Sequence, residues 1–267
     1  MFQVEESRTG YSLLNRLPQV QLTRLMRRMQ RVPLSAKQVL HHAHDPIDFA
    51  YFLESGIAAI LVVLQNGASA EVGVVGREGM VGLPIVWGGR SSHTEAMVLT
   101  AGTALRISRA DLGAELKHNP GLMRLILDFM MGFYAQVSQT AACNGHHTLD
   151  QRLARWLLLA HDRSDGDDLE LTQEFLSMML CVHRPAISLA ASSLQRDGAI
   201  EYHRGHIKIV DRDCLEDSSC ECYLAAQQPV RHVSAPTYSG PASLGPQPYG
   251  RAQRSSAQRS PSYAQKH

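Results

Sequence analysis

The fold of this chain is decided by the stretch Thr172-Gln-Glu-Phe-Leu-Ser-Met-Met-Leu-Cys-Val-His-Arg-Pro-Ala-Ile-Ser-Leu-Ala-Ala-Ser-Ser-Leu-Gln-Arg196, which predicts two short helices around a tight turn. Thr172 is suited to cap the first helix, because its hydroxyl can accept a free backbone N–H at a helix start. Pro185 fits just inside the second helix, where the missing N–H of proline is no loss. Cys181–His183 has the length of a turn, although Cys181 stands where glycine is frequent and where a non-glycine residue disfavours positive φ.

The second helix of this stretch has two contrasting faces. Its inner stripe holds Ile187, Ala190, Ala191 and Leu194, and its outer stripe holds Arg184, Ser188, Ser192 and Gln195. An apolar back and a polar front without acids suit the floor of a DNA major groove. Gly198 then ends the helix, and residues 199–203 and 206–210 predict a hairpin around Arg204-Gly205. This order is that of a winged helix-turn-helix, and the hairpin argues against the alternative of an ordinary helical pair in a core.

Length and charge limit the classes of protein that the chain can belong to. The 267 residues predict one or two domains, and a net charge of +1 excludes a purely electrostatic DNA binder. Any contact with DNA must therefore rest on a local patch. Residues 183–208 contain four basic residues and two acidic ones. The basic residues are Arg184, Arg196, Arg204 and Lys208, and the acidic ones are Asp197 and Glu201.

The number and spacing of the cysteines and the hydropathy of the chain predict its cellular compartment. Five cysteines at irregular spacing do not form a disulfide framework. No secretory signal opens the chain, and no apolar run is long enough to cross a membrane. We therefore expect a cytoplasmic protein with reduced thiols and no membrane contact.

The N-terminal half predicts a helix followed by a set of strands. Residues 11–31 carry apolar side chains at helical spacing, namely Leu22, Leu25, Met26 and Met29. Strand patterns extend from about Val39 to Ser108, at residues 49–52, 57–64, 70–74, 96–99 and 103–107. Asn66-Gly67 between two apolar runs is a strong hairpin signal. Short antiparallel strands at regular spacing predict a small barrel or jelly roll, so the fold class is α+β.

A long helix is predicted to follow the strands. Ser108 and Asp111 form an acidic capping box, and Pro120 begins the long helix. Its apolar stripe resembles a coiled-coil seam and comprises Leu122, Ile126, Phe129, Phe133, Val137 and Thr140. Packing against the barrel is the alternative, but we expect a homodimer, because a two-fold protein matches two DNA half-sites. Asn144-Gly145 is a predicted hinge, and Thr148 with Gln151 caps a further helix.

The C-terminal segment differs in composition from the rest. Beyond residue 223 lie six of the 12 prolines and five Lys or Arg, with no acid. Residues 223–267 are therefore predicted to be a disordered basic tail. Such a tail either adds phosphate affinity or does nothing.

A β-roll, a long helix and a winged helix-turn-helix in this order resemble the Crp/Fnr family of transcription regulators. The resemblance covers roughly residues 11–212, and its specific parts are Tyr51-Phe-Leu-Glu-Ser-Gly56, Glu71-Val-Gly-Val-Val-Gly-Arg-Glu-Gly-Met-Val-Gly82 and the two short helices. It implies a sensor domain at 11–118, a dimerisation helix at 119–145 and a DNA-binding domain at 146–212. It implies a regulator rather than an enzyme. The partners would be double-stranded DNA, RNA polymerase, a second copy of the chain and a small-molecule effector.

The resemblance also implies the DNA-contacting residues. Arg184 matches the family's base-reading arginine, which can bind guanine O6 and N7 together. Pro185 and Leu189 replace the glutamate and second arginine of the best-known members, so the operator should differ from theirs. The remaining expected contacts, mostly with phosphates, come from Thr172, Gln173, His183, Ser188, Ser192, Arg204 and Lys208.

The expected effector pocket departs from that of cyclic-nucleotide binders. Gly82 keeps the glycine of the ribose-binding Gly-Glu pair, but Leu83 replaces the acid. Ser92-His93 occupies the place of the phosphate-binding Arg-Ser pair, and Arg90-Ser91 comes two positions early. A buried phosphate needs a paired cation, so we expect weak or absent binding of cyclic AMP. The first cysteine is Cys143, which excludes the N-terminal iron–sulfur cluster of another branch, and no cofactor is expected.

Other functions remain as alternatives. The run His41-His42-Ala-His44-Asp45 resembles a cupin metal site, which would make the chain a metalloenzyme, but it lacks a closely following glutamate. Cys214, Cys220 and Cys222 are a possible metal or redox cluster, although neither spacing fits a zinc site. Cys143 and His146-His147 near the hinge either tune switching or simply pack. A β-roll signalling module that acts on a partner protein is the third alternative.

Overall fold

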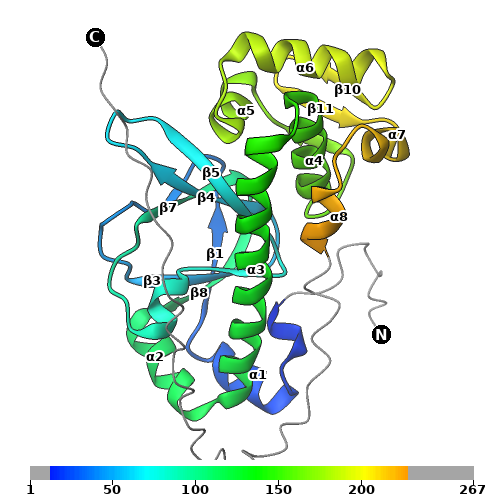
Figure 1. Ribbon diagram of the computed structural model, residues 1–267. Coiled ribbons are helices and arrows are strands. Elements are labelled where there is room, and N and C mark those ends of the chain that lie inside the picture. Colours follow the sequence, from blue (N-terminus) through cyan, green and yellow to red (C-terminus); the bar gives the residue numbers. More distant parts are fainter. Residues whose placement is uncertain (1–12, 228–267) are drawn as a thin grey trace, which may run out of the picture. The chain divides into compact units, whose positions relative to one another are not determined.

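The computed structural model describes residues 13–227, which form a β-roll, a long helix and a winged domain in chain order (Figure 1). The N-terminal part comprises η1 (Leu13–Arg16), α1 (Gln19–Met26), β1 (Gln30–Leu34), β2 (Val39–His41), β3 (Phe49–Leu53), β4 (Ile57–Val63), β5 (Ser69–Val75), β6 (Met80–Val81), η2 (Leu83–Trp87), β7 (Thr94–Thr100), β8 (Gly102–Ser108) and α2 (Arg109–His118). The long helix α3 (Pro120–His146) follows. The C-terminal part comprises α4 (Leu149–His161), β9 (Asp168–Glu170), α5 (Gln173–Leu180), α6 (Arg184–Arg196), β10 (Ile200–His203), β11 (His206–Ile209), α7 (Arg212–Asp217) and α8 (Cys222–Gln227).

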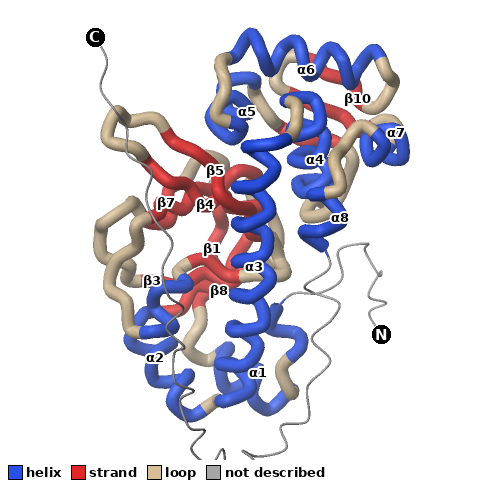
Figure 2. The backbone as a smooth tube through the Cα atoms, viewed as in Figure 1, coloured by secondary structure: helices blue, strands red, loops and turns tan. Residues whose placement is uncertain are grey.

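Two four-stranded antiparallel sheets make the β-roll, as the strand patterns predicted (Figure 2). One sheet has the order β1-β8-β3-β6 and the other β2-β7-β4-β5. Leu53, Ile60 and Val98 are buried between the two sheets, whereas Phe52 and Leu61 on the outer faces are buried against helices. Burial of this apolar surface is the main source of stability for the roll.

The helix α3 packs closely on the roll at a bulge in β5. The register of the β4–β5 pair shifts after Ile60, which leaves Val72 without a partner residue. Next to this bulge, a Cβ at Gly73 would lie 2.8 Å from side-chain atoms of Phe133 and Gln136. The Val74 backbone N–H donates to Gln136 Oε1 over 2.6 Å. The bulge and the glycine together let α3 bond directly to the sheet edge.

The apolar stripe predicted as a dimer seam on α3 instead covers the roll. Leu122 and Ile126 are completely buried, and Phe129 and Phe133 pack against the roll's core. The prediction chose the wrong face, because spacing alone does not tell which partner a stripe meets. A second apolar stripe lies free on the other side of α3, where Leu127, Met131 and Tyr134 are 38%, 58% and 68% exposed.

The winged domain follows the predicted pattern closely. Thr148 and Gln151 form the complete capping box of α4, and the Thr172 hydroxyl accepts the Phe175 N–H at the start of α5. The axes of α5 and α6 are bent by 102°, within the range of about 90–120° typical of helix-turn-helix units. Cys181 lies in the left-handed region with φ of 54°, as its position in the turn suggested. β10 and β11 form the hairpin, and β9 extends it to three strands, which the sequence did not predict.

Three other expectations differ from the structure. The helix expected within residues 11–31 ends at Met26, because the chain from Gln30 pairs with β8 as strand β1. Asn144-Gly145 continues α3 rather than breaking it. The tail was predicted to begin at residue 223, but Cys222–Gln227 is helical; residues 228–267 lie outside the described part. For β1, pairing with a strand distant along the chain overrides the local helical pattern.

Within residues 13–227, none of the helices could span a membrane by itself. Among these residues, the bent pair α5 and α6 is long and apolar enough for a membrane span only when the two helices are counted together.

Candidate nucleic-acid interface

The outer face of α6 is polar, exposed and free of acids. Arg184 and Pro185 begin the helix and are exposed, and Ser188 and Ser192 follow at four-residue spacing. Both serine hydroxyls donate to carbonyl oxygens one turn earlier, Ser188 to Arg184 and Ser192 to Ser188. Leu189 is 75% exposed on the same side. This face offers one cation, two hydroxyls and one apolar group to a partner.

The inner face of α6 is held rigidly by the winged domain. Ile187, Ala190 and Leu194 are almost completely buried in the core that also contains residues of α4 and the wing. Gln195 Oε1 accepts the Tyr202 backbone N–H over 2.9 Å, which joins the helix to β10. Gln195 was expected on the outer stripe, but this bond turns its side chain toward the wing. Base recognition requires a helix that is held rigidly, because hydrogen bonds to base edges tolerate little displacement.

The wing tip lies beside the first helix of the motif. Arg204 and Gly205 have positive φ values of 45° and 88°, as in a two-residue hairpin turn. A Cβ at Gly205 would lie 3.3 Å from Thr172 Cγ2, so the tip and the start of α5 are adjacent. The wing therefore presents Arg204 next to the capped end of α5, as phosphate contacts would need.

Most of the predicted DNA contacts are accessible. Gln173 and Ser188 are half-buried, and the exposed ones are Thr172, His183, Arg184, Pro185, Ser192, Arg204 and Lys208. His183 is the N-cap residue of α6, although its side chain makes no capping hydrogen bond. The hydroxyl of Thr172 is already used to cap α5, so a contact with DNA would have to share this oxygen.

The expected effector residues lie along one side of the roll. Gly82 has φ of 97° and is the N-cap residue of η2, while Leu83 is half-buried and packs against the core that contains Leu112 of α2. The carbonyls of Arg90 and Ser92 accept the N–H groups of Ile47 and His44. Ser91 bridges Pro46, and the ring of His93 contacts that of His44 at 5.2 Å. The Arg90 side chain is exposed, and the apolar Leu83 is half-buried.

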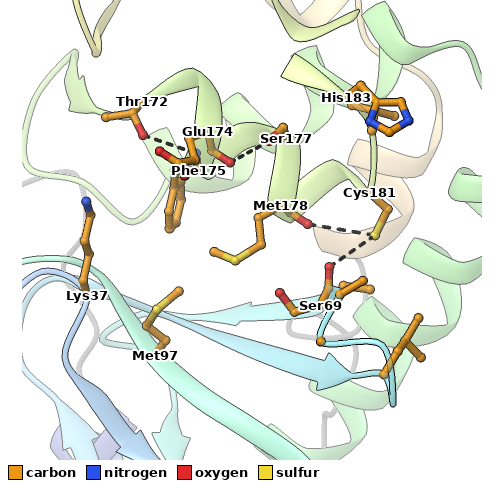
Figure 3. A pocket seen from close by; sticks show the side chains of 15 residues that line it. Lys37, Ser69, Met97, Thr172, Glu174, Phe175, Ser177, Met178, Cys181 and His183 are labelled. Carbon is orange, nitrogen blue, oxygen red and sulfur yellow. Dashed lines mark hydrogen bonds between the residues drawn. The ribbon is translucent and has the colours of Figure 1, made fainter. Parts of the chain in front are cut away.

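A cavity of about 640 Å³ lies instead between the β4–β5 hairpin and the helix-turn-helix (Figure 3). Figure 3 shows Lys37, Ser69 and Met97 on the roll side and residues of α5 and the turn on the other. None of the expected effector residues lines this cavity, which Phe175, Met178 and Cys181 close from the side of the motif. Sequence reasoning missed it, because it is built by segments that are distant along the chain.

A buried hydrogen bond joins the roll to the winged domain. Trp156 Nε1 of α4 donates to Glu71 Oε2 of β5 over 2.5 Å. Burial raises the pKa of Glu71 to about 7, and the Trp156 hydrogen bond and the charges of Arg155 and Arg163 only partly oppose this. The carboxyl group is therefore close to its titration point at neutral pH.

Glu71→Gln is expected to stabilise the folded chain above pH 7 by on the order of 1–3 kcal/mol. Because the pKa of Glu71 is raised from 4.5 to about 7 on folding, the folded chain binds more protons than the unfolded chain between these values. Wild-type stability therefore falls as the pH rises through this window. Glutamine keeps an acceptor for Trp156 without the buried charge.

Urea unfolding at pH 5 and pH 8 measures this effect. Glu71→Gln should raise the free energy of unfolding strongly at pH 8 and little at pH 5. Glu71→Ala leaves the Trp156 N–H unpaired and should lower the free energy of unfolding at both pH values. A Gln variant less stable than wild type at pH 8 would contradict the assignment.

The histidines proposed for a cupin-like metal site do not converge. His41 is almost fully buried in β2, His42 pairs with Glu95 over 2.8 Å, and His44 contacts His93. Among residues 13–227, they do not form a group of metal-ligand atoms close to one another. The expected trio of cysteines is also separated, since Cys214 Sγ lies against the Asp197 carbonyl, whereas Cys220 and Cys222 lie elsewhere.

Comparisons with known families agree with this geometry. A family model described as a cyclic nucleotide-binding domain matches residues 31–119, and one described as a Crp-like helix-turn-helix domain matches residues 151–218. Together the two matches cover more than half of the chain. A search of curated proteins found no significant match.

Several solved structures share the fold at low sequence identity. FixK2 from Bradyrhizobium japonicum is 16% identical with a TM-score of 0.62, covering 72% of this chain and 98% of that one. The c-di-GMP-responsive global regulator CLP of Xanthomonas campestris is 16% identical with a TM-score of 0.59, covering 73% and 100%. A CRP-family transcriptional regulator from Thermus thermophilus, TTHB099, is 18% identical with a TM-score of 0.60, covering 72% and 96%.

Proposed function

Because this chain belongs to the Crp/Fnr family of transcriptional regulators, we propose that it binds a specific double-stranded DNA site as a homodimer, with Arg184 reading a base in each half-site. The observation that carries this proposal is the exposed, non-acidic face of α6 on a rigidly packed winged domain. Arg184 stands at the first turn of the helix, where the backbone N–H groups also favour an anionic partner.

The other exposed groups of this face take complementary roles. Leu189 offers an apolar contact for a thymine methyl group, and the hydroxyls of Ser188 and Ser192 suit base edges or phosphates. Arg204 and Lys208 of the wing hold the phosphate backbone, which positions the protein without reading sequence. The chain acts in the cytoplasm, where it regulates transcription through RNA polymerase rather than as an enzyme.

The signal at the β-roll is a small molecule other than cyclic AMP. By the resemblance to cyclic-nucleotide binders, the apolar Leu83 stands where a ribose needs a carboxylate, and the Arg90 side chain is exposed rather than buried for a cyclic phosphate. The boundaries expected from the sequence assign sensing to residues 11–118, dimerisation to 119–145 and DNA binding to 146–212.

Selection of genomic fragments by the purified full-length protein tests this function. The enriched sequences should share a motif with two-fold symmetry and half-sites about one helical turn, roughly 10 base pairs, apart. Adding cyclic AMP should leave the bound fraction unchanged. Failure to enrich any sequence over random competitor would contradict the proposed DNA binding.

A further inference from the structure

Four metal-ligand side chains meet where α3 ends and the C-terminal segment returns to it. Cys143 lies in the last turn of α3, His147 is its C-cap residue, Cys222 begins α8 and Cys220 lies just before it. The candidate ligand atoms of all four lie within 4.8 Å of one another. The three cysteines are almost completely buried, at 0%, 5% and 1% exposure.

The separations within this cluster match a tetrahedral zinc site. Zinc–sulfur bonds of about 2.3 Å and zinc–nitrogen bonds of about 2.0–2.1 Å place tetrahedral ligands roughly 3.6–3.8 Å apart. Cys143 Sγ and Cys220 Sγ are 3.6 Å apart, and Cys222 Sγ and His147 Nδ1 are 3.5 Å apart. All four ligand atoms can therefore surround one ion with little movement.

Neighbouring side chains are arranged as around a metal site. His147 directs Nδ1 toward the thiols, and its other ring nitrogen, Nε2, lies 3.3 Å from Glu221 Oε2. A carboxylate on the second nitrogen fixes the ring orientation of ligating histidines. The Gln139 side-chain amide donates to Cys222 Sγ over 2.9 Å, which would stabilise a thiolate.

We propose that Cys143, His147, Cys220 and Cys222 bind one zinc ion that clasps the C-terminal segment onto α3. Three thiolates and one imidazole form a soft, tetrahedral set that prefers zinc. A multinuclear iron–sulfur cluster spreads its thiolates over separate iron atoms, so the tight grouping favours a single ion. All four positions are filled by the protein, so the site is structural rather than catalytic.

The main alternative function for these cysteines is a redox switch that works by disulfide formation. A disulfide joins only two sulfur atoms, whereas three sulfur atoms and one imidazole nitrogen converge here within 4.8 Å of one another. This convergence of four ligand atoms favours metal binding over the oxidation of one cysteine pair.

The position of the site indicates what the metal does. His147 directly precedes the capping residue Thr148 of α4, the helix that supports the motif. Next to Cys222, the buried Tyr223 donates its hydroxyl to Asp162 at the end of α4. Zinc would therefore hold the end of α3, the start of α4 and α8 together.

The test is the metal content of the full-length protein purified under reducing conditions, followed by zinc titration of the chelator-treated chain. Wild type should contain about one zinc ion per chain. Cobalt(II) in place of zinc should give the visible spectrum of a tetrahedral thiolate site. Cys143→Ser and Cys222→Ser should lose the bound zinc, whereas Cys214→Ser and Cys181→Ser, outside the cluster, should keep it.

A milder variant covers the case in which a cysteine variant fails to fold. Glu221→Gln leaves all four ligands in place, and its zinc affinity should fall by roughly 10–100-fold. Circular dichroism of each variant establishes that it is folded. A folded wild type that neither contains zinc nor binds added zinc, or one that holds iron instead, would overturn the proposal. Because these measurements use no DNA, they are independent of the proposed DNA recognition.

Discussion

Replacing Met131 and Tyr134 together by glutamate is expected to convert the proposed dimer into monomers and to lower operator affinity by about 10²–10⁴-fold. Both side chains belong to the apolar stripe that α3 leaves uncovered, and their spacing places them on one face of the helix with Leu127. Contiguous exposed apolar groups of this kind mark interaction surfaces. Unpaired carboxylates buried between two such helices would be strongly unfavourable.

The loss of affinity follows from the two half-sites. In a dimer the second winged domain binds at a high effective concentration once the first is bound, and a monomer loses this gain. Analytical ultracentrifugation gives the assembly state, and gel-shift titration on the selected fragment gives the affinity. Val20→Glu is the matched control, because it introduces the same charge at an apolar residue that is 83% exposed on α1. A double variant that remains dimeric and binds normally would remove this face from the proposed interface.

Arg184→Ala is expected to reduce affinity for the operator by roughly 30-fold to 10⁴-fold, because each of the two half-sites loses about 1–3 kcal/mol, while weak binding to random DNA persists. The guanidinium is exposed at the first residue of α6 and makes no intramolecular ion pair among those found in residues 13–227. Its removal should therefore leave the fold unchanged and delete one bidentate base contact per half-site.

Two further variants separate base reading from charge. Arg184→Lys keeps the positive charge but cannot reproduce the bidentate contact, so it should retain non-specific binding and lose discrimination. Arg196→Ala removes the same charge from the last residue of α6, and its effect should be small and similar on all sequences. Gel shifts with operator and random duplexes measure the specific and the non-specific DNA affinity of each variant. Equal loss from Arg184→Ala and Arg196→Ala would show that only charge matters.

The position of the 640 Å³ cavity suggests how sensing and DNA recognition are physically connected. Its walls come from the β4–β5 hairpin and from α5, and the Glu71–Trp156 hydrogen bond closes the same junction. The hairpin also contacts the turn of the motif directly, since Cys181 Sγ lies 3.9 Å from the Ser69 carbonyl oxygen, so a displacement of the hairpin can be transmitted to the helix-turn-helix.

Local chemistry in the sequence was sufficient to predict most of the secondary structure. The caps at Ser108, Thr148 and Thr172, the turn at Cys181 and the hairpin at Arg204-Gly205 all depend on interactions within a few residues. The outer face of α6 is also a local property, because helical periodicity alone separates it from the inner stripe. The candidate DNA contacts could therefore be identified before the structure.

Interactions between distant segments could not be predicted in this way. Periodicity identified a stripe on α3 but not its partner, and the roll covers that stripe because the β5 bulge and Gly73 admit Phe133. The strand β1 was missed because its pattern has no alternation and only pairing with β8 makes it a strand.

The sequence by itself determined the order of the elements and the residues that α6 exposes on its outer face, because hydrogen bonding and side-chain periodicity within a helix are short-range. Only the tertiary structure decided which face of α3 stays open, that Glu71 meets Trp156 and that Cys143 lies beside Cys220, 77 residues further along the chain. These contacts depend on how packed surfaces fit together in three dimensions, and no spacing along one segment records that fit.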